Sequence, residues 1–328
     1  MQSLDDSIAA IATAPGTAGL AVVRVSGAGA LAVADAVFRG GTRLAAVAGH
    51  TLHHGWAVDT RRPDVAGEPM RLDEVVAAVF RAPRSYTSED TVEFSCHGGG
   101  VPAQRVLAAL LASGARLAGP GEFTLRAFLR GRLDLAQAEA VADLVHAETE
   151  SASDLALAQL AGQLSQQLGA IENRITDATA EVEARVDFAE DVGGIETPAH
   201  VRAAIATVSA ELEVLLAGAP WARAVREGVR VPLVGQPNAG KSSLFNALLG
   251  ADRAGGLAGA VANPRHADAL SRARAALGRA TAAAEQGAPG EIVALELRES
   301  LAAVGEVTGR NASEELLERI FARFCVGK

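Results

Sequence analysis

A glycine-rich segment late in the chain has the residue types and spacing of a phosphate-binding loop. It reads Gly235-x-x-x-x-Gly240-Lys241-Ser242, the Gly-x-x-x-x-Gly-Lys-Ser/Thr pattern. In that pattern, backbone N–H groups and the start of the next helix surround a phosphate, the lysine ammonium reaches the outer phosphates, and the serine hydroxyl ligates Mg²⁺. An apolar run precedes the loop and a helical pattern follows it. Residues 229–249 are therefore predicted to form strand, loop and helix, with Pro232 as an irregularity in the strand.

The domain that normally supports such a loop is missing from the sequence. A nucleotide-hydrolysing α/β domain takes roughly 100–200 residues, but a glycine- and alanine-rich linker begins after Leu249 and helical sequence follows it. No later segment has the pattern of a strand followed by a metal-binding aspartate. A guanine-specifying Asn-Lys-x-Asp motif is excluded, because Lys241 and Lys328 are the only lysines. We expect a phosphate-binding motif without its domain.

Composition indicates a helix-rich globular protein. The 328 residues give room for about two domains; 49% are hydrophobic, 21% charged and only 4% aromatic. No apolar run approaches the ~20 residues of a membrane span, and the N-terminus lacks a signal-peptide pattern. Cys96 and Cys325 have no metal-ligand spacing and indicate no disulfide framework. We expect a cytoplasmic protein whose net charge of −9 disfavours tight nonspecific nucleic-acid binding by the whole surface.

Residues 1–120 are predicted to form a mixed α/β domain. Strand patterns occupy 8–11, 20–25, 51–58, 74–80 and 91–97, and helical patterns occupy 28–37 and 102–112. Arg24 and Glu93 each place a charge inside an apolar strand, where a lone ion is costly unless it is paired or liganded. The alternative is that one face of each strand simply faces solvent.

The rest of the chain is predicted to be helical. Residues 125–216 keep a helical pattern with a break at 187–198, and helices are expected at 265–284, at 291–304 and after Ser313, which suits an N-cap. We therefore divide the remainder into a helical domain at 121–219, a remnant and linker at 220–262, and a second helical part at 263–328. One buried stripe is expected to contain Leu157, Leu160, Leu164, Leu168, Ile171 and Ile175.

The last residues contain two candidate functional groups. Arginine supplies nearly all the cations, so lysine at only two positions is informative. A compact ammonium suits the phosphate loop, and by the same argument Lys328 is either a functional group or a terminal lysine left in solvent. Cys325 is a candidate catalytic nucleophile, since thiols react as thiolates. The alternative is a partly buried cysteine at a helix end.

Several short motifs spread along the chain occur together in one protein family. They are Asp6-Ser-Ile-Ala-Ala-Ile-Ala-Thr, Val23-Arg24-Val-Ser-Gly27, Tyr86-Thr-Ser-Glu89-Asp90 with Glu93, His97-Gly-Gly, Pro120-Gly-Glu-Phe-Thr-Leu-Arg-Ala-Phe128, Leu133-Asp-Leu-Ala-Gln-Ala-Glu-Ala140, the phosphate loop, and Phe324-Cys-Val-Gly-Lys328. Together they resemble the bacterial and organellar tRNA-modifying GTPase family MnmE, also called TrmE. Members of this family have a G domain inserted into the helical domain, and most of that G domain has no counterpart in this sequence.

The resemblance implies a fold and a set of sites. It implies an α/β N-terminal domain that dimerises and binds 5-formyltetrahydrofolate, an all-α bundle assembled from two chain segments, and a remnant of a P-loop G domain. Matching positions would line the folate site with Arg24, Glu93, Arg132 and Lys328; Arg132 stands where the family commonly has lysine. In the G domain, which uses GTP, Mg²⁺ and K⁺, the corresponding nucleotide residues are Gly235, Asn238 (also K⁺), Ala239, Gly240, Lys241, Ser242 (also Mg²⁺) and Ser243.

The family activity implied is a GTP-driven, carboxymethylaminomethyl-type modification at C5 of the wobble uridine of certain tRNAs, performed with the flavoprotein MnmG (GidA). For this chain we expect no GTP hydrolysis, because its G domain is truncated. The alternative to an enzyme is a folate-binding dimeric scaffold that keeps the one-carbon site. A third possible function is that of a folate-dependent aminomethyl transferase, and only fold analogy supports it.

Overall fold

The structure is a computed structural model of the 328-residue chain. It describes residues 5–63, 65–188, 196–228, 232–236, 239–241, 243–244 and 259–327. Two compact units are present: a sheet unit, Met1–Leu133 with Ser313–Lys328, and a helical unit, Asp134–Ala312. The mixed α/β and all-α classes predicted from the sequence are confirmed. The sequence grouped residues 121–133 and 313–328 with the helices, whereas their contacts place them with the sheet.

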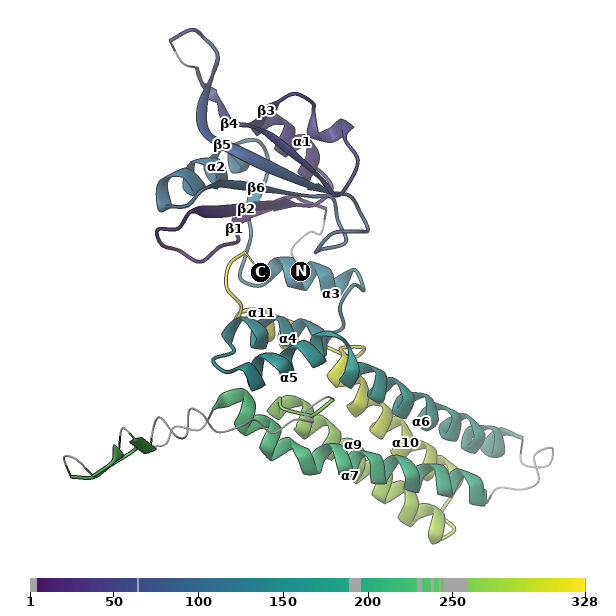
Figure 1. Ribbon diagram of the computed structural model, residues 1–328. Helices are drawn as coiled ribbons and strands as arrows, with labels where there is room; N and C mark the ends of the chain where they lie inside the picture. The colour runs from purple at the N-terminus through teal and green to yellow at the C-terminus, as the bar shows by residue number, and fades with distance from the viewer. Residues whose placement is uncertain are drawn as a thin grey trace. The chain divides into compact units, whose positions relative to one another are not determined.

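The sheet unit is built on a seven-stranded sheet with the order β3-β4-β5-β6-β2-β1-β7 (Figure 1). Neighbouring strands are antiparallel except β1 and β7, which are parallel. The strands are β1 (Ile8–Ile11), β2 (Leu20–Ser26), β3 (Phe38–Gly40), β4 (Thr51–Pro63), β5 (Pro69–Phe80), β6 (Thr91–His97) and β7 (Arg116–Leu117). Strands β4 and β5 are longer than predicted, and β3 was not predicted, because three residues give no periodic signal.

Two helices cover one face of this sheet. Helices α1 (Ala30–Val37) and α2 (Gly100–Ala112), with the short 3-10 helix η1 (Leu44–Ala46), pack on the inward residues of the strands, among them Val23 and Val25. Since side chains alternate along a strand, Arg24 belongs to the opposite face. Helix α3 (Glu122–Leu129) lies on that opposite face, where Phe123 packs with Ile8 and Ala10 (Figure 1).

A buried ion network fixes α3 to the sheet. Arg126 on α3 is 1% exposed, and its guanidinium donates to Asp6 Oδ1 at 2.5 Å, Glu122 Oε1 at 3.1 Å and Glu89 Oε1 at 3.4 Å. Arg116 donates to Asp6 and Glu122 from the β7 side. Buried charges need such partners because an unpaired ion costs several kcal/mol, so these segments are tied together.

The C-terminal segment returns to the sheet unit. Helix α11 (Glu314–Phe321) is capped by Ser313, whose hydroxyl accepts from Leu316 N–H as predicted, and it packs on α3. Beyond it, Gly121 N–H donates to Cys325 O at 3.4 Å. Gly327 has φ +98°, and a Cβ there would lie 2.4 Å from Ile11 O. Only glycine fits this approach.

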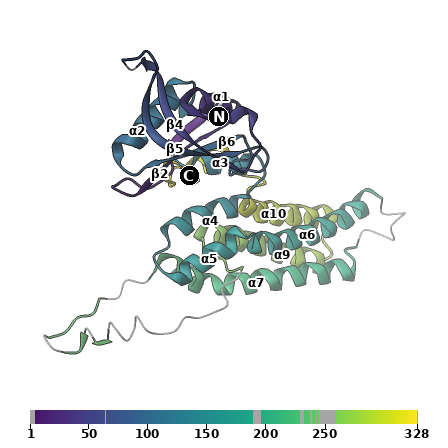
Figure 2. The same cartoon turned by 45° about the horizontal axis from the view of Figure 1, so that its top comes forward.

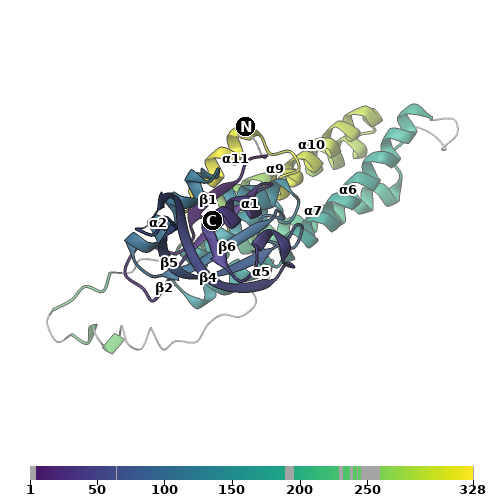
Figure 3. The same cartoon turned by 90° about the horizontal axis from the view of Figure 1, so that it is seen from above.

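The helical unit contains six described helices that form one bundle. They are α4 (Leu135–His146), α5 (Glu150–Leu160), α6 (Gln163–Asp187), α7 (Ala199–Glu227), α9 (Pro264–Glu285) and α10 (Gly290–Thr308). Figures 2 and 3 show α6, α7, α9 and α10 running side by side. One core joins residues from before and after the phosphate-loop segment, for example Ile171, Leu212, Leu277 and Leu297. The bundle is thus assembled from two chain segments.

Two expectations about this unit need correction. Leu157 is 48% exposed, because α5 ends at Leu160 and α6 begins at Gln163, so the predicted stripe is continuous only from Leu164 onward. Helix α7 is long and apolar enough, by length and composition, to cross a membrane, although no such run was expected. In the bundle its Val201, Ile205, Val208 and Leu212 are buried in the core.

A buried carboxylate links α4 to α9 and makes stability depend on pH. Glu139 accepts from Arg265 Nη2 at 2.6 Å and lies 2.6 Å from His266 Nε2. Burial raises the pKa of Glu139, but the hydrogen bonds and charges of His266 and Arg265 outweigh burial and lower it to about 2. A carboxylate with a depressed pKa stabilises the fold above its unfolded pKa, and that stabilisation is lost as pH falls toward the folded value.

We therefore expect Glu139→Gln to lower the free energy of unfolding near neutral pH by about 3 kcal/mol, since Arg265 loses its buried carboxylate partner and His266 loses a hydrogen-bond partner. The difference from wild type should shrink between pH 4.5 and about 2. Urea denaturation across that range measures it, with the exposed Glu213→Gln as the control. A difference that stays constant with pH would contradict the assignment.

Candidate ligand-binding site on the sheet unit

Arg24 and Glu93 face each other across two neighbouring strands. They are register partners on β2 and β6, and Arg24 Nε donates to Glu93 Oε1 at 2.7 Å. Their side chains are 13% and 25% exposed, so the pair is largely shielded from water. Of the two possibilities that the sequence left open, the charges are paired. Arg24 Nη1 is nevertheless buried without a hydrogen-bond partner among the residues that the structure describes, which leaves a donor for a ligand.

Arg132 joins this pair through Tyr86. The Arg132 guanidinium lies 5.0 Å from the centre of the Tyr86 ring and the Arg24 guanidinium 4.9 Å from it. Arg132 Nη1 also donates to Tyr86 O at 2.9 Å. In the described part of the chain, no carboxylate pairs with Arg132. Of the four predicted folate residues, Arg24 and Arg132 thus lie at one ring, and Glu93 is hydrogen-bonded to Arg24.

Hydrogen bonds to Glu89 hold the turn that carries Tyr86 in place. Glu89, in the same turn, accepts from Arg130 Nε at 3.0 Å and from the buried Ser26 hydroxyl at 3.1 Å. Ser26 lies two residues after Arg24 on β2, so it belongs to the same sheet face. The hydrogen bonds that Glu89 accepts therefore connect the turn to the strand that carries Arg24 and to the segment that follows α3.

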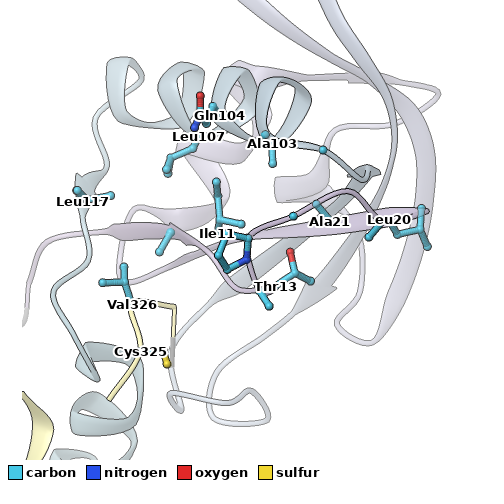
Figure 4. Close-up of a pocket in the computed structure, with 17 residues that line it drawn as sticks. Ile11, Thr13, Leu20, Ala21, Ala103, Gln104, Leu107, Leu117, Cys325 and Val326 are labelled. Carbon is cyan, nitrogen blue, oxygen red and sulfur yellow. The ribbon is translucent and has the colours of Figure 1, made fainter. Parts of the chain in front are cut away.

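A separate cavity of about 610 Å³ lies beside β1 and includes the C-terminal segment in its wall (Figure 4); Arg24, Glu93, Tyr86 and Arg132 are not among its lining residues. Its lining is mostly apolar: Ala103 and Leu107 come from α2, and Cys325 and Val326 from the C-terminal segment. Ala10 also lines it and is the register partner of Arg24 on β1. A cavity of this size fits a small organic ligand.

The two cysteines differ in environment. Cys325 is exposed at the cavity. Cys96 is buried on β6, and burial, together with the charge of Asp73, raises the pKa of its thiol to about 11. Lys328, the fourth predicted folate residue, lies outside the described residues; Gly327 before it is packed against β1.

The phosphate-loop residues form no comparable site in the described part of the chain. Residues 232–234 are not in a strand, contrary to prediction, while 229–231, Asn238 and Ser242 lie outside the described residues. Lys241 Nζ donates to the carbonyl oxygens of Gly235 and Gln236 at 2.9 and 2.7 Å. Ala239, Gly240 and Ser243 are described, but no described sheet supports the loop. Among the described residues, no cluster of His, Cys, Asp or Glu is suited to a metal.

The residues around Tyr86 fit a reduced folate. Such a ligand offers carboxylate and carbonyl oxygens, which accept from guanidinium groups, and ring N–H groups, which donate to a carboxylate. The matching partners are Arg24 Nη1 and the guanidinium of Arg132, which have no hydrogen-bond acceptor and no carboxylate partner respectively among the described residues, and the oxygens of Glu93.

Comparison with known proteins agrees with the motifs. A family model described as the MnmE helical domain matches residues 135–325, and one described as the GTP-binding protein TrmE N-terminus matches residues 7–132. The chain belongs to the MnmE family. The tRNA modification GTPase MnmE of Symbiobacterium thermophilum is 35% identical over 99% of this chain and 100% of its own length. That of Syntrophotalea carbinolica is 32% identical over 99% of both chains.

The relatives contain residues that this chain lacks. The alignment with the Symbiobacterium MnmE is 462 residues long, although this chain has 328. The MnmE of Chlorobaculum tepidum is 48% identical, but the match covers 75% of this chain and only 51% of that relative. The chain therefore spans about half the length of several curated MnmE relatives that it matches.

Sequence reasoning missed Tyr86, Phe123 and Thr124 as parts of the site. The centre of the Phe123 ring lies 5.3 Å from the Arg24 guanidinium carbon, and Thr124 Oγ1 is 2.8 Å from Tyr86 Oη. A signal was present, because Tyr86 is the only tyrosine of the chain. It stands in one MnmE motif, and Phe123 and Thr124 stand in another.

The thiol environments give a direct prediction. We expect one fast-reacting thiol per folded chain with a disulfide reagent at pH 8, because only the thiolate reacts and Cys96 is both buried and largely protonated. Cys325→Ser should remove the fast phase, whereas Cys96→Ala should keep it. Two fast thiols in the folded wild-type protein would contradict this account.

Proposed function

We propose that this MnmE-family chain is a dimeric folate-binding protein that retains the one-carbon site of a tRNA modification system and does not hydrolyse GTP. The observation that supports it is that Arg24 and Arg132 both lie at the Tyr86 ring and Glu93 binds Arg24, while one guanidinium nitrogen of Arg24 is buried with no hydrogen-bond partner among the described residues. An orphan donor of this kind is costly unless a ligand accepts from it.

The proposed ligand is 5-formyltetrahydrofolate, which supplies a one-carbon unit when bound. In this proposal Arg24 and Arg132 donate to its acceptor oxygens, Glu93 keeps Arg24 oriented through the Nε bond and accepts from ligand N–H groups, and Lys328 adds a further cation. The partly shielded setting strengthens each of these charged hydrogen bonds relative to water.

A catalytic role is the second candidate, because the matched relatives are named tRNA modification GTPases. It would comprise the C5 carboxymethylaminomethyl-type modification of the wobble uridine, with MnmG and tRNA as partners in the cytoplasm. That role needs a working G domain, with Mg²⁺ and K⁺. GTP turnover by the purified chain separates the two candidates.

Folate binding predicts the behaviour of a specific variant. Arg24→Ala should weaken 5-formyltetrahydrofolate binding by about tenfold or more, since a charged hydrogen bond is worth about 1.5–3 kcal/mol. Isothermal titration calorimetry measures this, and Arg105→Ala is the matched control, an exposed arginine on α2. Equal affinity of Arg24→Ala and wild type would refute the site assignment.

We also predict no meaningful GTP hydrolysis. Catalysis needs an ordered metal shell, a positioned water and stabilised transition-state charge besides the phosphate loop, and the loop takes its shape from the sheet on which its strand packs. Phosphate release with GTP, Mg²⁺ and K⁺ should equal the background and should be unchanged in Lys241→Ala. Turnover that Lys241→Ala abolishes would support the catalytic candidate instead.

The dimer is the remaining part of the proposal. We expect a homodimer formed by residues 1–120, independent of the phosphate-loop segment. Sedimentation velocity at micromolar concentration should give a dimer for wild type and for a chain in which residues 229–258 are replaced by a short glycine–serine linker. A monomer in both would refute this part.

A further inference from the structure

The Tyr86 ring contacts both arginines of the proposed site. The centre of the ring lies 4.9 Å from the Arg24 guanidinium carbon and 5.0 Å from that of Arg132. Both distances are within the range at which a cation is attracted to an aromatic face. The two arginines come from separate parts of the chain, β2 and the segment after α3, so the ring is the element that they share.

The ring is held in place by two contacts that do not involve the arginines, and the backbone of Tyr86 adds a third contact, to Arg132. Its hydroxyl lies 2.8 Å from the hydroxyl of Thr124, which is fully buried on α3. Its backbone carbonyl accepts from Arg132 Nη1 at 2.9 Å. The ring packs on the small cluster formed by Ile8, Ala10, Ala118 and Phe123. These contacts leave the side chain little rotamer freedom before a ligand arrives.

Two cations at one ring repel each other, and among the described residues only Arg24 has an acid partner. Glu93 accepts from Arg24, whereas Arg132 has no carboxylate partner in the described residues. An arginine also loses up to about 2 kcal/mol of rotamer entropy when it is ordered. A fixed aromatic face lowers both costs, because it attracts the guanidinium groups and restricts their positions in the free protein.

We propose that Tyr86 is a positioning residue of the folate site, whose ring orders the guanidinium groups of Arg24 and Arg132 before the ligand binds. This inference rests on the proposed folate function and deepens it. The ring, rather than the hydroxyl, performs this task, because the attraction to cations belongs to the aromatic face.

The test compares two substitutions that separate ring from hydroxyl. Tyr86→Phe keeps the ring and should bind 5-formyltetrahydrofolate within about threefold of wild type. Tyr86→Leu removes the ring and should weaken binding by about tenfold. Trp56→Leu is the matched control: it removes a different arginine–aromatic pair of the sheet unit, with Arg71 at 4.6 Å, and should leave affinity unchanged.

A spectroscopic readout follows the positioning directly. Because Tyr86 is the only tyrosine, protein labelled with fluorotyrosine gives a single fluorine resonance from this site. Without ligand, the resonance should shift in Arg24→Ala and in Arg132→Ala, and it should stay in place in Arg105→Ala. In the wild-type protein, the resonance should shift when 5-formyltetrahydrofolate is added, and the ligand concentration at half of the full shift should equal the calorimetric Kd.

The outcomes distinguish this inference from the function on which it rests. Binding that requires Arg24 and Arg132 but is unchanged in Tyr86→Leu overturns the inference and leaves the proposed function standing. Equal losses in Tyr86→Phe and Tyr86→Leu also overturn it, since the ring would not be what matters. A wild-type protein that does not bind the folate refutes the proposed function and this inference with it.

Discussion

The buried guanidinium of Arg126 is the constraint on which the sheet unit depends. A fully desolvated cation is tolerable only with its acids in place, and these come from Asp6 before β1, Glu89 in a turn before β6, and Glu122 at the start of α3. Burial raises the pKa of Asp6 and of Glu122, yet hydrogen bonds from Arg116 and Arg126 outweigh it and lower both values. Asp6 and Glu122 therefore stay ionised near neutral pH, and the Arg126 hydrogen bonds join three distant segments at one point.

The ligand-binding residues inherit their positions from this network. Tyr86 precedes Glu89 in its turn, and Phe123 and Thr124 directly follow Glu122, so the ring and the residues that hold it are placed by the same carboxylates that satisfy Arg126. The turn before α3 serves a second purpose. Gly121 there has φ +64°, and a Cβ would lie 2.8 Å from Phe321 O. The C-terminal segment can approach so closely only because this residue is glycine.

The features that could be predicted from the sequence are those that depend on residues close together in the chain. Strand alternation placed Arg24 and Glu93 as charges within apolar strands, because this pattern depends on neighbouring residues. For the same reason the helical periods indicated the helical segments, although not the breaks that separate α3, α4, α5 and α6. The pairing of Arg24 with Glu93 depends on strand register between residues 69 positions apart, so the sequence left pairing and solvent exposure open. The role of Tyr86 depends on α3 crossing the sheet, a tertiary contact without a local pattern. The prediction that Leu157 belongs to the buried stripe was wrong for a similar reason. A helix break between Leu160 and Gln163 separates Leu157 from the helix that carries the rest of the stripe.

The bundle shows why the fold does not require the segment that carries the phosphate loop. On the entering side, Arg226 near the end of α7 donates twice to Asp143 on α4, at 2.7 and 2.8 Å. On the returning side, Gln159 donates to Ala260 O at 3.1 Å. Ala222 and Ala262, one from each side, pack with Leu155 in a single cluster. Both ends of the segment are therefore anchored on the bundle near one another, and the loop-closure cost of whatever lies between them grows only slowly with its length. Helical packing can consequently tolerate a long or a short insertion here, whereas a phosphate loop needs its own sheet to keep its shape.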